Sequence, residues 1–393
     1  MNLISERIKK LRHRAYIEYF RRLPIENNKV ICWSNNMKSY GCNPKYLTEY
    51  LLKHFPGKYD IVWVFNEETP VPDELPDGVR TVRYFSIDYL RELHTAKIIV
   101  TNARMAEWLC FYKRKEQFYI QTWHSSLRLK KIEGDADMSE SYIKSAQKDS
   151  EKIDLLISGC RFSTEIFKRA FWYNGKIFEC GTPRCDVFFE NSSEAERFVR
   201  EKYRIDENIK IALYAPTFRK NFAADDYGID YSSVKAALER RFGKEFCLIY
   251  RFHPNVIGQK KKQDIPWLID GTGYHDMQQL LAASDVLITD YSSCMFDAVI
   301  AGKLCFLYTP DIDEYTNNER GLYFDIDKLP FFASRSNDGL CRGINEFDLK
   351  RYNDGISSFL KQTGSFEDGN ACRRISDVIR EKCFPDTVKN GGN

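Results

Sequence analysis

The sequence predicts two α/β domains, each built on a parallel sheet that is covered by helices on both faces. Short β-rich segments alternate with helical ones along most of the chain, which is typical of βαβ units. The 393 residues exceed what one hydrophobic core usually serves, so we expect two cores. Polar residues directly follow most of the predicted strands, where ligands of doubly wound sheets bind.

The first series of elements begins near Lys29. Its strands are short apolar runs, and its helices carry apolar residues at helical spacing. In chain order we expect a strand at 30–33, a helix at 44–54, a strand at 61–65, a helix at 87–94, strands at 98–101, 118–122 and 155–158, a helix at 163–170, and a strand at 177–180. The last strand leads into Gly181-Thr-Pro-Arg184, which completes one doubly wound domain.

A polar, helix-prone connection at 192–203 separates this series from a second one. The strands expected in the second series are 211–214, 246–250, 267–270, 286–289 and 304–308. We therefore assign residues 1–22 to an N-terminal helix, 23–195 to the first domain and 196–393 to the second.

Composition excludes several classes of protein. The hydrophobic fraction of 43% and the aromatic fraction of 14% indicate a folded chain, and a net charge of +3 excludes a generally basic nucleic-acid binder. We see no signal peptide, and no apolar run approaches the roughly 18 residues that span a bilayer. The 12 cysteines are scattered, without a C-x-x-C pair or zinc-ligand spacing, which fits a reduced cytoplasm.

The first 22 residues are strongly basic, with seven Lys or Arg residues against Glu6 and Glu18. An apolar stripe recurs at helical spacing through Ile4, Ile8, Leu11, Ala15 and Tyr19. Such a helix can lie on an anionic membrane surface, where each nearby cation contributes on the order of 1 kcal/mol. It can equally pack on its own domain with a solvated basic face. Both interpretations stay open at the sequence level.

The segment Ser284–Asp297 is the most informative part of the chain. Val286–Thr289 is predicted as a buried strand, and a helix with the apolar body Met295–Ile300 follows it. We expect Ser292 and Ser293 to cap this helix. The free backbone N–H groups and the helix dipole at such a start favour an anion between the two serines.

Other predicted strand ends carry comparable chemistry. Because the carboxyl ends of parallel strands share one edge of a sheet, these residues are expected to line a cleft. They are Trp123, His124, Ser125 and Ser126; Arg184 and Asp186; Pro216, Thr217 and Arg219; Arg251 and His253; and Asp290 to Ser293.

The chain has neither a P-loop nor a G-x-G-x-x-G fingerprint, so a P-loop nucleotidase and a simple dinucleotide dehydrogenase are not supported. Two Asp-x-Asp pairs, at Asp135–Asp137 and Asp311–Asp313, lack the context of a metal–diphosphate site and are interpreted as solvated loop acids. Without a metal, a diphosphate would be neutralised by arginines through charge-assisted bonds. The candidates are Arg219, Arg251 and Arg320, together with Ser292 and Ser293.

Two of the six histidines, His124 and His253, sit at predicted strand ends in different domains. An imidazole has an unperturbed pKa of about 6.5, so it can accept a proton from an attacking hydroxyl at neutral pH. We assign His124 as the base. His253, close to Arg251, is better placed to bind a phosphate or a leaving group.

At this point six motifs resemble the CDP-glycerol glycerophosphotransferase family in order and spacing. They are YIQTWHSSLRLKKI (Tyr119 to Ile132), CGTPRCDVF (Cys180 to Phe188), LYAPTFRKN (Leu213 to Asn221), YRFHPN (Tyr250 to Asn255), ASDVLITDYSSCMFD (Ala283 to Asp297) and ERGLYFD (Glu319 to Asp325). Two weaker stretches, NPKYLTEYL (Asn43 to Leu51) and AKIIVTNAR (Ala96 to Arg104), are also similar. The resemblance covers roughly residues 29 to 370.

The resemblance implies a GT-B architecture of two facing Rossmann-like domains, attached peripherally to the cytoplasmic face of the bacterial membrane. Members move glycerol phosphate, or in relatives ribitol phosphate, from a CDP-activated donor to a lipid-linked acceptor, and release CMP. They build teichoic-acid-type or capsular polymers, and a metal is not a necessary part of the site. No cofactor and no nucleic acid are expected.

Carried over residue by residue, the resemblance implies that His124 is the base. It places His253, Arg251, Ser292 and Ser293 at the donor diphosphate and polyol, with Arg219 and Asp290 nearby. We group Arg320 with the donor residues, and on the acceptor side we expect Trp123, Ser125, Ser126, Lys130 and Arg184.

One departure and three alternatives remain. The usual W-H-G-T-P of the family reads Trp123-His124-Ser125-Ser126-Leu127 here, so the turn after His124 loses the freedom of a glycine, which changes the expected acceptor surface.

The first alternative function is transfer from a CDP-ribitol donor, and the second is that of another sugar-nucleotide enzyme of the same architecture. The third is a membrane-bound assembly partner without turnover. Primase and polymerase activities are not separated by the sequence.

Overall fold

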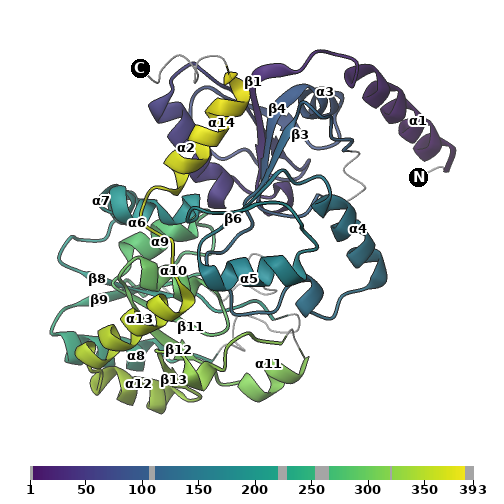
Figure 1. Ribbon diagram of the computed structural model, residues 1–393. Coiled ribbons are helices and arrows are strands. Elements are labelled where there is room, and N and C mark those ends of the chain that lie inside the picture. Colours follow the sequence, from purple (N-terminus) through teal and green to yellow (C-terminus); the bar gives the residue numbers. More distant parts are fainter. Residues whose placement is uncertain (1–2, 106–110, 220–227, 253–264, 319–320, 386–393) are drawn as a thin grey trace, which may run out of the picture.

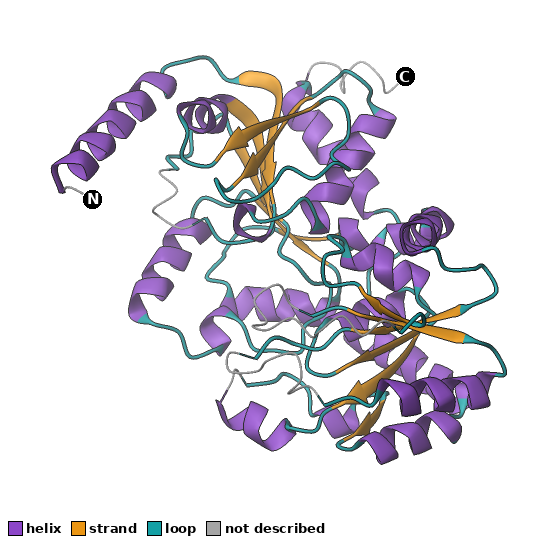
Figure 2. Cartoon of the chain, turned by 180° about the vertical axis from the view of Figure 1, so that it is seen from behind, coloured by secondary structure: helices purple, strands orange, loops and turns teal. Residues whose placement is uncertain are grey.

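The structure is a computed structural model, and it describes residues 3–105, 111–219, 228–252, 265–318 and 321–385. Its two parallel sheets lie one above the other, each with helices on both faces (Figures 1 and 2). The first sheet has the strand order β3-β2-β1-β4-β5-β6-β7, and the second has β10-β9-β8-β11-β12-β13. In each sheet the strand order changes direction beside the strand that comes first in the chain, β1 or β8, as in doubly wound nucleotide-binding folds. The predicted GT-B architecture is confirmed.

In the first sheet, the central strands are mostly apolar and buried where helices cover both faces, whereas the first strand begins with four polar residues, Glu26 to Lys29. The strands are β1 (Glu26–Trp33), β2 (Asp60–Phe65), β3 (Val79–Arg83), β4 (Ala96–Thr101), β5 (Phe118–Gln121), β6 (Leu155–Ser158) and β7 (Ile177–Glu179). The helices up to the domain connection are α1 (Leu3–Phe20), α2 (Cys42–His54), α3 (Ile87–Thr95), α4 (Glu140–Ser150), α5 (Arg161–Ala170), α6 (Val187–Glu190) and α7 (Ser192–Tyr203).

The second sheet repeats this design around one large apolar core. Its strands are β8 (Lys210–Tyr214), β9 (Phe246–Tyr250), β10 (Leu268–Asp270), β11 (Val286–Thr289), β12 (Leu304–Tyr308) and β13 (Phe332–Ser334). Its helices are α8 (Tyr231–Phe242), α9 (Met277–Ala283), α10 (Cys294–Ile300), α11 (Ile312–Asn318), α12 (Asn337–Asn345) and α13 (Leu349–Thr363). The edge strands β3 and β13 were not predicted from the sequence, because both are short and partly exposed.

The C-terminal helix α14 (Ala371–Cys383) differs from the predicted assignment of 196–393 to one domain. Its residues Ile375 and Ile379 are fully buried in the core of the first sheet, and the helix lies beside α2 (Figure 1). Asp186 of the first domain accepts hydrogen bonds from the N–H groups of Ala371 and Cys372, at 3.1 and 2.7 Å. The chain therefore returns to the first domain at its C-terminal end.

The N-terminal helix α1 packs against α3, and the residues described in this contact lie outside the expected apolar stripe. Ile17 and Phe20 are buried in the core of the first domain, and the His13 ring lies edge-on against Phe85 with centroids 4.3 Å apart. Ala15 and Tyr19, which belong to the expected stripe, are exposed. In the last turns of α1 the buried face therefore differs from the predicted one, while Ile4, Ile8 and Leu11 of the stripe lie outside the described side chains.

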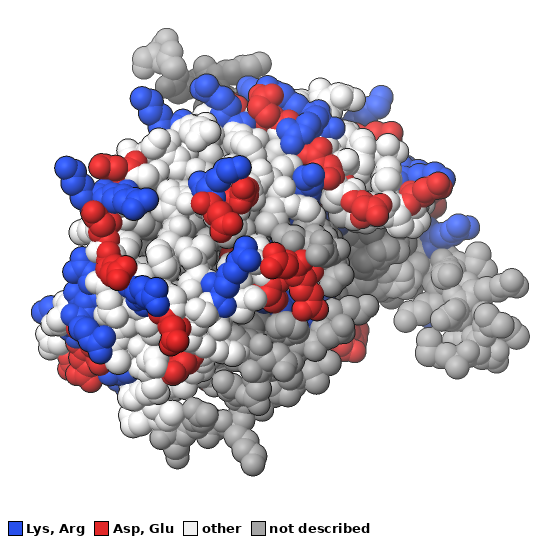
Figure 3. All heavy atoms as spheres, turned by 90° about the horizontal axis from the view of Figure 1, so that it is seen from below, with Lys and Arg blue, Asp and Glu red and all other residues white. Residues whose placement is uncertain are grey.

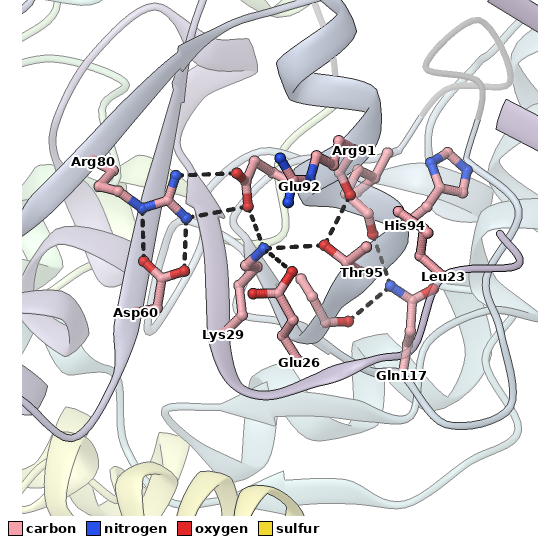
Figure 4. Close-up of polar contacts among 12 residues, drawn as sticks. Leu23, Glu26, Lys29, Asp60, Arg80, Arg91, Glu92, His94, Thr95 and Gln117 are labelled. Carbon is pink, nitrogen blue, oxygen red and sulfur yellow. Dashed lines mark hydrogen bonds and ion pairs between the residues drawn. The ribbon is translucent and has the colours of Figure 1, made fainter. Parts of the chain in front are cut away.

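Buried charge also occurs away from the cleft, at the start of β1 (Figure 4). The Lys29 ammonium is 2.6 Å from both Glu26 and Glu92, and it donates to the Thr95 hydroxyl at 3.1 Å. Arg80 binds Glu92 and Asp60 in turn. A lysine can be buried there because every charge in the network has a partner.

Candidate functional site

The carboxyl ends of the two sheets hold most of the polar residues that the sequence predicted. In each sheet the strand order reverses at its central pair, β1 and β4 in the first and β8 and β11 in the second. Ligands of doubly wound sheets bind at such reversal points. Figure 3 shows the lower face of the second domain, where basic and acidic side chains are interspersed. Within the described part of the chain, this face has no patch of a single charge that would indicate a ligand, so the contacts of individual residues are the evidence for one.

At the first reversal point, two asparagines hold the ends of β1 and β4 together. The backbone N–H of Asn35 donates to Asn102 Oδ1 at 2.8 Å, and Asn102 Nδ2 donates to Asn35 Oδ1 at 3.0 Å. Asn35, Asn36 and Met37 all have φ values between 50° and 65°, a strained run for residues with a Cβ. Neither asparagine was a predicted site residue, although Asn102 directly follows a predicted strand and Asn35 lies two residues after another.

His124 is positioned by this pair. Its Nδ1 lies 3.2 Å from the backbone oxygen of Asn102. Because a carbonyl oxygen only accepts hydrogen bonds, Nδ1 carries the proton of the neutral ring and Nε2 is the nitrogen that can accept one. The ring is exposed and stacks on the buried Trp123 ring at 4.5 Å. The geometry suits the predicted general base.

The backbone around His124, residues 122–126, forms the His124 turn. Trp123 adopts φ +50°, and its N–H donates to Gln121 Oε1 at 2.9 Å. Asn43, at the start of α2, donates to the backbone oxygens of Thr122 and Trp123 and accepts from the Arg184 N–H at 3.0 Å. Sequence reasoning missed Asn43 as a site residue, although it opens a stretch that resembles the family.

After the turn, the chain crosses to the second domain. The N–H of Leu129 donates to Ser293 Oγ at 3.2 Å, and its backbone oxygen accepts from the Tyr323 N–H at 2.7 Å. Ser125 and Ser126, expected on the acceptor side, are buried. Lys130 is half-buried, with its ammonium 5.2 Å from the centre of the Tyr315 ring. This segment therefore contributes to the domain contact.

Arg128 is buried without a carboxylate partner among the described residues. Its guanidinium lies 4.2 Å above the Phe167 ring, and Nη2 donates to the Ser125 oxygen at 3.3 Å. Among the described residues, Nε and Nη1 have no hydrogen-bond partner. Burial lowers the pKa of Arg128 to about 10. The other two buried arginines that the structure describes, Arg184 and Arg219, each bind carboxylates, as does the half-buried Arg104.

At the second reversal point, Arg219 is held between two carboxylates. Its Nη1 donates to Asp290 at 2.7 Å, and its Nε and Nη2 donate to the two oxygens of Asp311 at 2.5 and 2.9 Å. Asp290 also accepts from the Thr217 N–H at 2.8 Å. The expected role of Arg219 in neutralising a diphosphate does not match this arrangement, because two acids already balance its charge.

The expectation that the Asp-x-Asp acids are solvated is wrong for Asp311, which binds Arg219 and accepts from the Tyr291 hydroxyl at 3.1 Å. Asp135 of the other pair binds Arg169 and accepts a hydrogen bond from the Tyr323 hydroxyl, both at 2.7 Å.

Within the described ranges, no three His, Cys, Asp or Glu side chains are grouped so that they could hold a metal ion.

The two serines after β11 differ in their contacts. Ser292 Oγ accepts from the Cys294 N–H at 3.4 Å, as expected of a residue at the start of α10. Ser293 makes no side-chain cap, because its Oγ is used by Leu129 of the first domain. Both serines are half-buried.

Arg251 follows β9 and is half-buried. Its Nε donates to the Tyr274 oxygen at 3.3 Å, and burial lowers its pKa. Of the donor residues predicted from the sequence, His253 and Arg320 lie outside the described residues. The Asp276 carboxylate opposes the lowering of the Arg251 pKa, but it is bound to Lys45.

Arg184, expected on the acceptor side, instead forms an ion pair between the domains. Its Nη2 lies 2.8 and 2.6 Å from the two carboxylate oxygens of Asp297 on α10, and both side chains are buried. A second buried pair joins Lys45 of α2 to Asp276 at the start of α9, where the Tyr46 hydroxyl also donates at 2.9 Å. These two buried ion pairs join the first domain to the second.

The comparison with protein families now decides the identity. The model of the family described as CDP-Glycerol:Poly(glycerophosphate) glycerophosphotransferase matches residues 15–381. The chain belongs to this family. Within it, the chain is 31% identical over 374 residues to a teichoic acid poly(glycerol phosphate) polymerase of Bacillus spizizenii, covering 91% of this chain and 93% of the relative.

Two further relatives cover nearly the whole chain. A teichoic acid glycerol-phosphate transferase of Staphylococcus aureus is 29% identical, covering 96% of this chain and all of the relative. A solved structure of the wall teichoic acid polymerase TagF, soaked with CDPG, has a TM-score of 0.82 and 27% identity, covering 98% of this glycerophosphotransferase and 100% of that chain. In the described parts of this family member, no helix is long and apolar enough to cross a membrane.

Proposed function

We propose that this protein transfers glycerol phosphate from CDP-glycerol to a hydroxyl of a lipid-linked polyol-phosphate acceptor and releases CMP, during synthesis of a teichoic-acid-type polymer. Family membership and the relatives that act in glycerol-phosphate transfer support the reaction class. The observation that carries the mechanism is the Asn102–His124 contact, which gives His124 the tautomer of a base.

In the proposed step, Nε2 of His124 takes the proton of the acceptor hydroxyl. The oxygen then attacks the β-phosphorus of CDP-glycerol in line, a new P–O bond forms, and the bond to the CMP oxygen breaks, so that the electron pair leaves with CMP. Arg251, Ser292 and the backbone N–H groups that follow β11 hold the diphosphate. Arg219 orients Asp290 and Asp311 behind these groups.

The reaction is tested by incubating the purified protein with CDP-glycerol, CDP-ribitol or a UDP-sugar and a lipid-linked glycerol phosphate acceptor, with and without EDTA. We expect CMP release with CDP-glycerol that is unchanged by EDTA, because we propose a metal-free site. Release only with CDP-ribitol would reassign the polyol. Release of UDP or UMP, or of no nucleotide with any donor, would contradict the proposed function.

We also propose that α1 attaches the enzyme to an anionic membrane surface on the cytoplasmic side. Arg12, Arg14 and Tyr19 are exposed on this helix, and the Arg21 guanidinium lies 5.3 Å from the centre of the exposed Tyr112 ring. Cations of this kind attract anionic lipid, while aromatic rings suit the interface.

The membrane proposal is tested by changing Arg12 and Arg14 to Glu, which leaves the buried Ile17 and Phe20 in place. We expect the variant to lose most of its binding to anionic vesicles in a flotation assay, and to keep its activity on a soluble acceptor analogue. Lys202→Glu on α7 is the control for a charge change elsewhere. Unchanged flotation of the α1 variant would contradict the proposal.

A further inference from the structure

The connection between α13 and α14, residues 364–370, is a strap that carries the chain from the second domain back to the first. It pairs with the backbone that follows β6. The Arg161 N–H donates to the Gly364 oxygen, and the Phe366 N–H donates to the Gly159 oxygen, both at 2.8 Å. Cys160 and Ser365 form an antiparallel bridge between them. The strap is therefore held in one register next to the His124 turn.

Glu367 of the strap points its carboxylate into the first domain. Oε2 accepts from the Thr182 N–H at 3.0 Å, and Oε1 accepts from the Thr182 hydroxyl at 2.8 Å. The Ser126 side chain is a third hydrogen-bond partner. Ser126 lies two residues after His124, so one carboxylate joins the strap, the His124 turn and the loop that leads to Arg184.

The carboxylate occupies a tight cradle. A Cβ on Gly159 would lie 2.3 Å from Ser126 Oγ and 2.4 Å from Glu367 Oε1, distances that real side chains do not show. Gly181, with φ +82°, forms another wall, where a Cβ would lie 3.1 Å from Glu367 Oε2. The chain thus uses glycine at two positions to bring this carboxylate against the backbone of the first domain.

Among the residues that the structure describes, no cation forms an ion pair with the Glu367 carboxylate. Burial is the main cause that raises the Glu367 pKa, to about 7, while the hydrogen bonds from Ser126 and Thr182 oppose the rise. The charged strap neighbours Asp368 and Arg374 pair with each other at 2.5 Å. The other titratable groups around the cradle are Asp186 and the thiols of Cys160, Cys180 and Cys185.

We propose that Glu367 is a positioning residue, which fixes the His124 turn against the strap so that the base and the second domain are placed together. The proposal rests on the proposed function for its kinetic consequences. Loss of the carboxylate would release Ser126 and Thr182 and allow the His124 ring to move relative to the donor. Misplacement of a reacting group by about 1 Å costs up to about 100-fold in rate.

The kinetic test compares Glu367→Ala, Glu367→Gln and the wild type by CMP release. We expect the alanine variant to lose about 10- to 100-fold in kcat with the KM for CDP-glycerol nearly unchanged, because the donor site is not disturbed. Glutamine retains acceptor and donor groups and should recover most of the loss. Asp368→Asn, on the next and exposed residue, is the matched control and should match the wild type.

The pH dependence of stability gives a readout without substrate. Because the Glu367 pKa is about 7 in the folded protein against an ordinary value of 4.5, the folded state holds a proton that the unfolded chain has lost. This contribution to stability is therefore present at low pH and is lost as the pH rises through about 7. The Tm of Glu367→Gln relative to the wild type should rise between pH 5 and pH 8.

A chemical probe reports the position of His124 independently of turnover. We expect the rate of His124 modification by diethyl pyrocarbonate, followed by mass spectrometry, to change in Glu367→Ala and in Gly159→Ala, while exposed His275 is unaffected. If the wild-type protein releases no CMP, this result contradicts the proposed function and leaves the positioning role of Glu367 untouched. Unchanged His124 reactivity, or a kcat of Glu367→Ala equal to that of the wild type in an active enzyme, would overturn the positioning role.

Discussion

Replacing His124 by alanine is expected to reduce CMP release from CDP-glycerol by about 10²- to 10⁴-fold, the range that a general base usually contributes. The reason is the Nδ1 contact to the Asn102 oxygen, which leaves Nε2 as the proton acceptor at the end of the first sheet. The predicted donor groups lie in the other domain, so the affinity for CDP-glycerol should stay within about twofold, as isothermal titration calorimetry would measure.

The control for this variant is His275→Ala, which removes an exposed imidazole from the second domain. It should keep both activity and donor affinity. Equal loss of turnover and of CDP-glycerol binding in His124→Ala would contradict a role as base, because it would place the imidazole in the donor site instead.

Breaking the Arg184–Asp297 pair is expected to have the largest effect on stability. Arg184→Met leaves the Asp297 carboxylate buried opposite an apolar side chain, and an uncompensated buried charge of this kind costs about 3–5 kcal/mol. Burial already raises the pKa of Asp297, and the Arg184 charge opposes that rise. Urea unfolding, followed by tryptophan fluorescence, measures the change in the free energy of unfolding.

Arg128→Met is a matched control, because it also replaces a buried arginine by a side chain of similar length. Arg128 has no carboxylate partner among the described residues, so its removal leaves no buried charge behind. We expect its stability to equal or exceed that of the wild type. The double variant Arg184→Met with Asp297→Leu should recover much of the loss. A loss in Arg128→Met as large as in Arg184→Met would contradict this explanation.

The strands and the site edge could be predicted because their signals are local. The apolar runs before His124, Arg251 and Asp290 mark buried strands, and the polar residue that follows each run marks its carboxyl end. The exceptions are the edge strands β3 and β13, which are short and partly exposed, and the packing face of α1. In the last turns of α1 the buried face is decided by the contact with α3, which the spacing of apolar residues did not predict.

The partners of the charged residues were harder to predict. Arg219 and Arg184 were expected to meet phosphate or acceptor, yet each binds acids that lie 71 to 113 positions further along the chain. Asn43 and Asn102 were missed because an asparagine after a strand, or before a helix, is common in loops. Their importance depends on contacts with the His124 turn that sequence spacing does not encode.

The amino-acid pattern was sufficient to predict two doubly wound sheets, a candidate ligand-binding edge on each of them and a candidate catalytic histidine in the first, because each prediction follows from periodicity within a few residues. The three-dimensional packing established which charges are neutralised internally, how α14 returns to the first domain, and how Glu367 reaches Ser126. Those contacts join residues that are far apart in the chain, and burial determines their strength.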